Sequence, residues 1–243
     1  MTELEMKKYS RNALLGSFVS MLTAGLATMM YSVSISTIRT DLALTAVQAG
    51  SLGTYTFMGQ MLGGMVAGYL ADRYGRKNIL IVDVILATLA VFATSLLQSY
   101  SIFGILRFIT GVGLGGCYYI ASILIGEFVP TNKRGFMSGV ATSVWNFGYV
   151  VCCAMSAFAL PSIGWRWCFR ICALPIVFVI FMIFGMKDAP SFTAAKANRD
   201  KRDKEEGRKV NAYAEIWSHP RMRKSFIIWS ISMILYFYGY YCL

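Results

Sequence analysis

Charged residues are scarce in this chain. Only 14% of the 243 residues are Asp, Glu, Lys or Arg and 56% are hydrophobic, whereas a soluble domain has about 25% charged residues. The scarcity excludes an ordinary soluble domain and indicates a membrane protein. His219 is the one histidine, which excludes a histidine proton relay or a histidine-bound metal. Since no nucleophile–base pattern or metal-ligand spacing is present, we expect no enzyme, no metal and no cofactor.

Acidic residues are also few, at 12 against 23 basic ones, and the net charge is +11. Such a charge alone would suit a nucleic-acid binder. However, the long stretch 13–186 contains only two short basic clusters, at 73–77 and 133–134, and four isolated arginines: Arg39, Arg107, Arg166 and Arg170. No basic groove can form from this pattern. The expected surroundings are therefore a lipid bilayer and not nucleic acid.

Cysteines occur without the spacing of a disulfide framework or a zinc site. All six lie in apolar segments, where we expect them to act as small packing residues: Cys117, Cys152, Cys153, Cys168, Cys172 and Cys242.

Apolar stretches of about 20 residues can cross a bilayer as helices. Seven such stretches are present. The first runs directly into the second and has no small-residue cleavage site, so we expect no signal peptide. The predicted spans are 13–38, 46–71, 78–97, 101–125, 136–160, 168–186 and 225–243.

The basic residues predict the orientation of these spans. If the N-terminus is cytoplasmic, 19 of the 23 basic residues lie on the cytoplasmic side, as the positive-inside rule requires. We therefore expect a multi-pass protein of the plasma (inner) membrane with a cytoplasmic N-terminus. The polar stretch 187–224 mixes 11 basic with 6 acidic residues and is interpreted as a solvated linker, with lipid headgroup contact as the alternative.

The loop between spans 2 and 3 carries the sharpest motif, GYLADRYGRK at 68–77. Gly68 and Asp72 share a helix face, where a glycine lets another helix approach closely. Asp72 could then meet a helix N-terminus or an arginine, and Gly75 permits a tight turn. The motif, which includes Arg73 and Arg76, resembles the G-x-x-x-D-R-x-G-R-K loop of the major facilitator superfamily. A charged turn that only obeys topology is the alternative.

Span 4 and its exit contain a second block of motifs. Residues 107–113 read RFITGVG and residues 126–135 read GEFVPTNKRG, with twenty positions from Arg107 to Glu127. This block resembles the sugar-porter branch of the superfamily. The GWRW sequence at 164–167 is similar to the same branch, and KDAPSF at 187–192 is a degraded form of its motif after span 6.

The resemblance implies a fold and a mechanism. The expected fold is an all-α integral membrane protein with a six-helix N-terminal bundle (1–186) of two inverted repeats, a cytoplasmic linker (187–224) and the first helix of a second bundle (225–243). The resemblance also implies that Glu127 and Arg134 join inter-helix ion pairs near the Asp72 loop. Such pairs close the cytoplasmic side in one state and break in the other, or have a purely structural role.

Two features depart from proton-coupled members of the superfamily. Span 1 has no acidic residue between Arg11 and Asp41, where sugar and aromatic-acid symporters carry an aspartate. Asp83, in span 3, is a buried acid that either pairs with the basic loop or carries a proton. The G-x-x-x-G-P signature of drug antiporters is also missing from span 5, which argues against multidrug export.

Arg107 is expected about 9 Å below the outer end of span 4. Arg107, Gly111, Leu114 and Tyr118 share a helical stripe, which we interpret as facing the substrate cavity and favouring an anionic metabolite. Snorkelling of Arg107 to the surface is the alternative. Thr142 replaces a sugar-binding glutamine of the family, which argues against assuming a hexose. Polar and aromatic residues that could line the cavity are Tyr31, Ser34, Tyr118, Thr142, Trp145, Asn146, Tyr236, Tyr238, Tyr240 and Tyr241.

The sequence thus predicts a secondary active transporter of a small polar metabolite, an organic acid or sugar-like solute, working by alternating access. A proton as coupling ion is left open. The chain supplies one half of such a transporter and one further helix, so we expect no transport by this chain alone. The alternative is a non-transporting truncated membrane protein, or a half-transporter that assembles with a separate C-terminal half.

Overall fold

The computed structural model describes residues 3–188, 192, 217–228 and 231–232, with the side chains described from Tyr9 onward. The chain forms two compact units, Met1–Thr193 and Ala194–Leu243. In the second unit residues 220–228 are helical. The predicted seventh span and Tyr236, Tyr238, Tyr240 and Tyr241 lie mostly or wholly outside the described residues.

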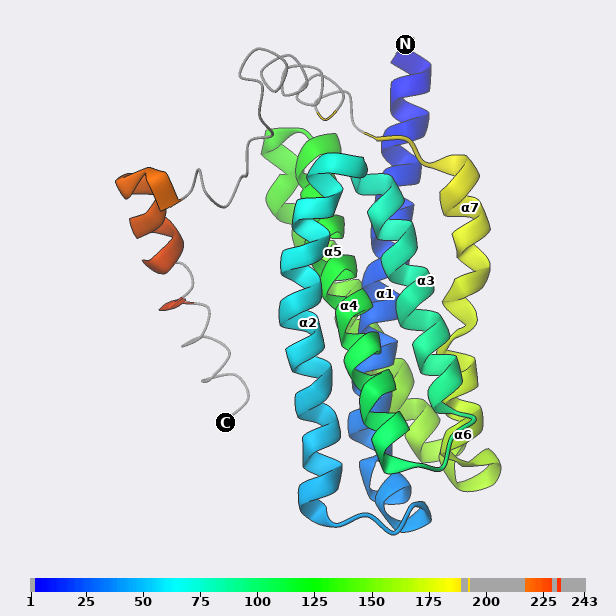
Figure 1. The fold of residues 1–243 in the computed structure, drawn as a ribbon. Helices are drawn as coiled ribbons and strands as arrows, with labels where there is room; N and C mark the ends of the chain where they lie inside the picture. The colour runs from blue at the N-terminus through cyan, green and yellow to red at the C-terminus, as the bar shows by residue number, and fades with distance from the viewer. Residues whose placement is uncertain (1–2, 189–191, 193–216, 229–230, 233–243) are drawn as a thin grey trace. The chain divides into compact units, whose positions relative to one another are not determined.

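The first unit is a bundle of helices that lie side by side (Figure 1). The described residues contain helices and no strand, which confirms the all-α prediction. The helices are α1 (Glu3–Asp41), α2 (Ala46–Tyr74), α3 (Arg76–Thr94), α4 (Tyr100–Phe128), α5 (Arg134–Phe158), α6 (Leu160–Cys172) and α7 (Phe178–Gly185), with 3-10 turns at Thr131–Lys133 and Leu174–Val177.

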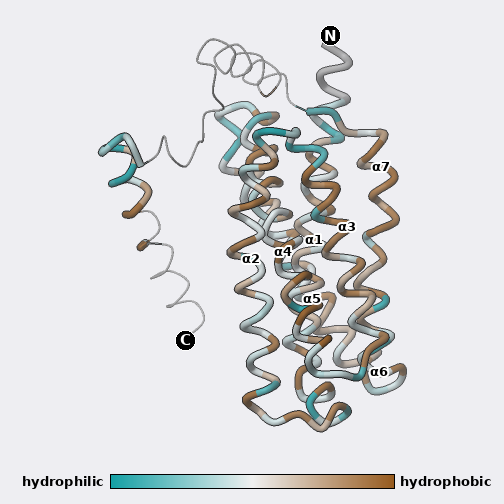
Figure 2. Tube along the Cα trace, viewed as in Figure 1, coloured by the Kyte–Doolittle hydropathy of each residue, from teal (hydrophilic) through white to brown (hydrophobic). Residues whose placement is uncertain are grey.

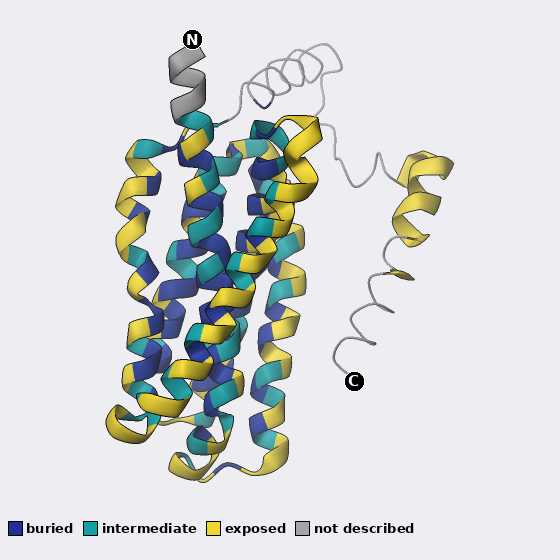
Figure 3. Cartoon of the chain, turned by 180° about the vertical axis from the view of Figure 1, so that it is seen from behind, coloured by how far each residue is buried: buried dark blue, intermediate teal, exposed yellow. Residues whose placement is uncertain are grey.

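Five helical stretches of the described chain are long and apolar enough to cross a membrane. They are Tyr9–Asp41, Arg76–Thr94, Tyr100–Phe128, Thr131–Phe158 and Leu160–Gly185. Helix α2 is less apolar, but its 29 residues extend about 43 Å, more than the thickness of the hydrocarbon core. Hydrophilic residues gather at the bundle end where α2 meets α3 (Figure 2), while buried positions follow the inward sides of the helices (Figure 3).

The sixth predicted span differs from the structure at its start. Its helical stretch begins at Leu160 and not at residue 168, and it consists of α6, a 3-10 turn and α7. Pro175 lies in the 3-10 turn and has no backbone N–H to continue the helix. The turn at Leu174–Val177 therefore interrupts the regular helix. A second departure from regular helix occurs at Gly164, which has a φ of 77°.

Helices α2 and α4 cross in backbone contact through glycines. A Cβ atom at Gly63 would overlap the backbone of Val112, and one at Gly111 would overlap the carbonyl of Thr56. Gly59 and Gly115 lie equally close to the backbone of the facing helix, whereas Gly64 lies against the ring of Tyr119. Small residues thus let the two backbones approach closely, as is common between membrane helices.

Helices α1 and α5 make a second crossing of the same kind. A Cβ atom at Gly25 would overlap the carbonyl of Trp145, and one at Gly148 would lie 3.0 Å from the nitrogen of Leu26. If α1, α2 and α3 are equated with α4, α5 and α6, the α2–α4 crossing corresponds to the α5–α1 crossing. This correspondence agrees with two repeats of three helices.

Gly68 differs from these glycines. No described atom lies within 4 Å of a Cβ atom built there. No helix of the described residues therefore approaches Gly68 closely, and an approach by another helix there stays a prediction.

The cysteines of the bundle are free thiols. Cys117, Cys152, Cys168 and Cys172 are buried, which confirms their packing role, whereas Cys153 is exposed. Cys242 lies outside the described residues.

We predict that Gly63→Ala destabilises the bundle by about 1–3 kcal/mol, because backbone atoms of α4 must move to admit the methyl group. The measurement is thermal unfolding of the purified chain in lipid or detergent. Gly50→Ala is the matched control on the same helix, since nothing lies within 4 Å of its Cβ position and alanine favours the helix. Equal stabilities of the two variants would contradict the backbone contact.

Candidate functional site

The turn between α2 and α3 consists of the single residue Gly75. Its φ of 102° is a conformation that other residues rarely adopt. Its N–H donates to the carbonyl of Ala71 at 3.0 Å, and its own carbonyl accepts from the N–H of Ile79 at 3.3 Å. A Cβ atom there would also lie 2.5 Å from the carboxylate of Asp188. The predicted tight turn at Gly75 is confirmed.

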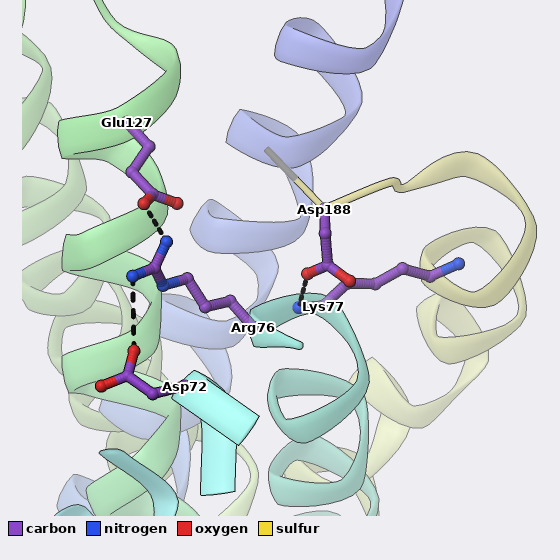
Figure 4. Close-up of polar contacts among 5 residues, drawn as sticks. All are labelled: Asp72, Arg76, Lys77, Glu127 and Asp188. Carbon is purple, nitrogen blue, oxygen red and sulfur yellow. Dashed lines mark hydrogen bonds and ion pairs between the residues drawn. The ribbon is translucent and has the colours of Figure 1, made fainter. Parts of the chain in front are cut away.

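Arg76 connects three helices at this end of the bundle. Its guanidinium pairs with Glu127 of α4 and lies 3.4 Å from the carboxylate of Asp72 of α2 (Figure 4). The side chains of Arg76 and Glu127 are only 17% and 16% exposed, whereas that of Asp72 is 60% exposed. The ring of Phe192 lies 5.5 Å from the guanidinium carbon. The Arg76–Glu127 pair is therefore the sheltered part of this network.

Asp188 fastens the segment after α7 to the start of α3. Its carboxylate accepts a hydrogen bond from the backbone N–H of Lys77 at 2.8 Å, where a helix N-terminus favours a negative charge. The ammonium of Lys77 donates to the carbonyl of Ile183 at 2.6 Å. We call Asp72, Arg76, Lys77, Glu127 and Asp188 the charged-end network.

Two predicted site residues lie beside this network and have other partners. Arg73 donates to the hydroxyl of Tyr69 at 3.4 Å and lies over the ring of Tyr74. Arg134 donates to the carbonyl of Val129 at 3.0 Å and so caps the end of α4. The ion pairs of the described residues do not include Arg134, in contrast to the pairing that the resemblance implied.

At the opposite end of the bundle, α1 is tied to α6. Asp41 accepts hydrogen bonds from Arg166 at 2.7 Å and from the indole of Trp165 at 3.0 Å. Arg166 also lies over the Trp165 ring, 4.5 Å from its centroid. The two ends of the bundle therefore each contain an ion pair between different helices.

Arg107 is fully buried, with 0% of the residue exposed, so the snorkelling alternative is wrong. Its guanidinium carbon lies 5.2–5.8 Å from the ring centroids of Tyr31, Phe103 and Phe169. One nitrogen donates to Thr94 at 3.4 Å, and Nε and Nη1 have no hydrogen-bond partner among the described residues. Aromatic faces and the C-terminal turn of α3 thus offset this charge in place of a carboxylate.

The residues predicted to line a substrate cavity fall into two groups. Tyr31, Ser34 and Arg107 are buried in the bundle, and Trp145 is half-buried. Tyr118, Thr142 and Asn146 are exposed on α4 and α5. The expected stripe is therefore divided, because Gly111 and Leu114 are buried and Tyr118 is 42% exposed. Tyr238 lies outside the described residues.

Asp83 is not paired with the basic loop. It is 6% exposed, and its Oδ2 atom has no hydrogen-bond partner among the described residues. Of the two roles expected for this acid, pairing with the loop is absent from the described residues.

Sequence reasoning left Asp188, Lys77 and Asp41 out of the site. Asp188 could have been identified from the sequence, because it lies in the degraded KDAPSF motif. Nothing in the sequence links Asp41 to Arg166, 125 positions away, because only the packing of α1 against α6 brings them together.

Membrane-length helices, two glycine crossings and ion pairs at both ends define a helical bundle of the multi-pass membrane class. Residues 17–243 match the family model described as Major Facilitator Superfamily. The chain belongs to this superfamily.

Two relatives of this chain are bacterial transporters. The cis,cis-muconate transport protein of Acinetobacter baylyi (strain ATCC 33305 / BD413 / ADP1) is 30% identical over 229 residues, which cover 94% of this chain and 55% of that protein. The niacin transporter NiaP of the same strain is 32% identical over 169 residues, which cover 70% of this chain and 38% of that protein. The chain thus spans about half the length, or less, of these relatives.

Solved structures with the same fold include a xylose transporter. The proton:xylose symporter XylE bound to 6-bromo-6-deoxy-D-glucose aligns with a TM-score of 0.68 at 21% identity, over 77% of this chain and 47% of that one. The inward open conformation of XylE from E. coli gives 0.68 at 20% identity, over 90% and 56%. These similarities show the fold of a transporter half.

We predict that Arg76→Gln and Glu127→Gln are coupled. Each variant leaves one buried charge without its partner, so the double variant should lose less stability than the two single losses together, by about 0.5–3 kcal/mol. Unfolding of the four proteins measures this difference. Arg73→Gln combined with Glu127→Gln is the control, and its effects should add. Additive losses in the Arg76 cycle would show that the pair contributes nothing.

Proposed function

We propose that this chain forms the N-terminal half, and the first helix of the second half, of a secondary active transporter. The solute is a small polar metabolite, an organic acid or a sugar-like compound, carried by alternating access. The similarity to muconate and niacin transporters supports this choice, and so does the fold shared with XylE.

The charged-end network is the observation that carries the proposal. Alternating access requires each bundle to move as one body against the other. Arg76 with Glu127, and Asp188 with Lys77, fasten α2, α3, α4 and the segment after α7 at one end. Gly68, which has no described atom within 4 Å of its Cβ position, lies one turn before the exposed Asp72 of this network. A second bundle could dock there and separate during gating.

Exposed polar residues on α4 and α5 suit a wall of a central cavity. Thr142 and Asn146 lie one turn apart on α5, and the amide of Asn146 donates to the Thr142 carbonyl at 3.0 Å. Tyr118 is exposed on α4. A lipid-facing helix surface would instead be apolar, so we assign these residues to a surface that faces water, solute and the second bundle.

Arg107 supplies the preference for an anion. Its charge is buried, two of its nitrogens have no hydrogen-bond partner among the described residues, and α1 offers no acid in the membrane part of its length. A carboxylate of the solute would supply the missing partner once the surrounding rings move. The proposal also includes a proton as the ion whose movement is coupled to transport of the solute.

The location follows from the basic residues. We place the charged-end network on the cytoplasmic side of the inner membrane together with the N-terminus, because 19 of the 23 basic residues then lie inside.

The second candidate function is a half-protein that only assembles with a separate C-terminal half. The exposed α5, with three buried residues in 25, favours such a contact.

Uptake of cis,cis-muconate tests the proposal. The complete transporter that contains this chain should accumulate muconate, and the purified chain alone should not, since half of the solute site lies on the second bundle. We predict that Arg107→Gln lowers uptake about 10–100-fold by removing a charge-assisted contact.

Arg107→Lys is the matched variant, because it keeps the charge and should retain part of the uptake. Expression and thermal unfolding of both variants separate loss of binding from loss of folding. Undiminished uptake by folded Arg107→Gln would contradict the anion site, and uptake by the chain alone would contradict the half-transporter.

Cysteine labelling tests the orientation. We predict that a membrane-impermeant maleimide labels Ser162→Cys, at the end opposite the charged-end network, in right-side-out vesicles. Thr131→Cys, at the charged end, should react only in inside-out vesicles, because the positive-inside rule places it in the cytoplasm. Both positions are exposed, and the unmodified chain gives the background from its native thiols. The reverse pattern would overturn the orientation.

A further inference from the structure

Asp83 occupies a notch between three helices. A Cβ atom built at Gly116 of α4 would overlap its carboxyl group, and the methyl group of Ala67 of α2 would lie 2.8 Å from the same Cβ atom. Gly113, one turn earlier on α4, lies against the carbonyl of Asp83 in the same way. The carboxyl group therefore takes up the space that the missing side chain of Gly116 leaves.

The surroundings of this notch are apolar. Asp83 lies in α3 among buried positions of one hydrophobic cluster, which contains Leu80, Val84, Cys117 and Ile120. An ionised carboxylate without a partner is costly in such surroundings, whereas a neutral carboxyl group is tolerated. The position therefore favours the protonated form.

The basic residues closest along the chain are engaged elsewhere. Arg76 pairs with Glu127 and Asp72, and the ammonium of Lys77 donates to Ile183. Arg73 of α2 contacts Tyr69 and Tyr74. None of these three cations offsets a charge on Asp83.

The other packed helices supply no counter-charge to Asp83 among the described residues. From α4, the titratable group that faces Asp83 is the thiol of Cys117, and Glu127 lies at the charged end. On α1, Arg11 is exposed. On α6, Arg166 pairs with Asp41 and Arg170 donates to Ser95. After α7, Lys187 lies over the ring of Tyr9 at 4.3 Å. A proton is thus the cation that this site can take.

We propose that Asp83 is a proton-binding site, protonated while α3 is packed against Gly113 and Gly116 of α4 and ionised only when the two helices separate. Binding neutralises the carboxylate, with the proton coming from water at the charged end. The use of this site as the coupling site rests on the proposed transport function, whereas proton binding itself does not.

Infrared spectroscopy of the full chain in lipid vesicles tests proton binding directly. The chain should show the C=O stretch of a protonated carboxylic acid at neutral pH, where an exposed aspartate, with a pKa of about 3.9, is ionised. Asp83→Asn, a close match in shape to the neutral acid, should lack this band. Asp72→Asn is the control and should keep it, because Asp72 is exposed. Absence of the band, or a band that persists in Asp83→Asn, overturns the proposal.

Alkylation of Cys117 provides a second measurement that needs no transport. Ionisation of Asp83 at alkaline pH should open the α3–α4 contact and expose this buried thiol to a membrane-permeant maleimide, detected on its peptide by mass spectrometry. The intrinsic pH dependence of the thiol cancels when the chain and Asp83→Asn are compared at the same pH. We expect a rate ratio of at least about tenfold at alkaline pH, and near unity at neutral pH. A ratio near unity throughout overturns the helix separation.

The two measurements test the proton site, and the uptake assay tests the transport function, so each proposal can be contradicted without the other. If muconate is not transported but the carboxylic acid band is present and lost in Asp83→Asn, the proton site stands and the proposed transport does not. If muconate is transported and the band is absent, the transport stands and the proton site does not.

Discussion

The cost of burying charge between apolar helices determines where the ionisable side chains of this bundle lie. At the charged end, Arg76 and Glu127 form a sheltered pair. At the opposite end, Asp41 holds Arg166. Between these ends lie Arg107, which is enclosed by aromatic rings, and Asp83, which has no cation beside it among the described residues. Each arrangement satisfies the same requirement, that a charge in a medium of low dielectric constant is paired, offset or neutralised.

Glycine contacts make this arrangement of charges compatible with a tightly packed bundle. The crossings of α2 with α4 and of α1 with α5 bring backbones together, so the helices gain dispersion contacts where lipid offers no hydrophobic driving force. The same helix α4 carries glycines toward α2 and toward α3, and Asp83 fills one of the resulting notches. Small residues thus decide both how closely the helices approach and where a polar group can be held.

The helices of the bundle are fastened to one another at one end, and polar side chains are exposed elsewhere on its surface. The charged-end network holds the helices of the bundle together, whereas Tyr118, Thr142 and Asn146 are exposed on α4 and α5. A bundle that is fastened at one end and exposes these polar side chains is suited to work against a second bundle. This division, together with membership of the Major Facilitator Superfamily, is the basis for the proposed transport.

The sequence by itself determined the class of fold, because long apolar stretches can satisfy their backbone in a bilayer only as helices. It also determined the family and the turn at Gly75, since these depend on local pattern and spacing. Only the tertiary structure decided which charges meet. Glu127 pairs with Arg76, whereas Arg134 caps α4 and joins no ion pair of the described residues. Arg107 is enclosed and not at the surface, and Asp83 is not paired with the basic loop. The physical reason is that side-chain partners depend on the rotation and crossing of helices far apart in the chain, which residue spacing along one helix does not specify.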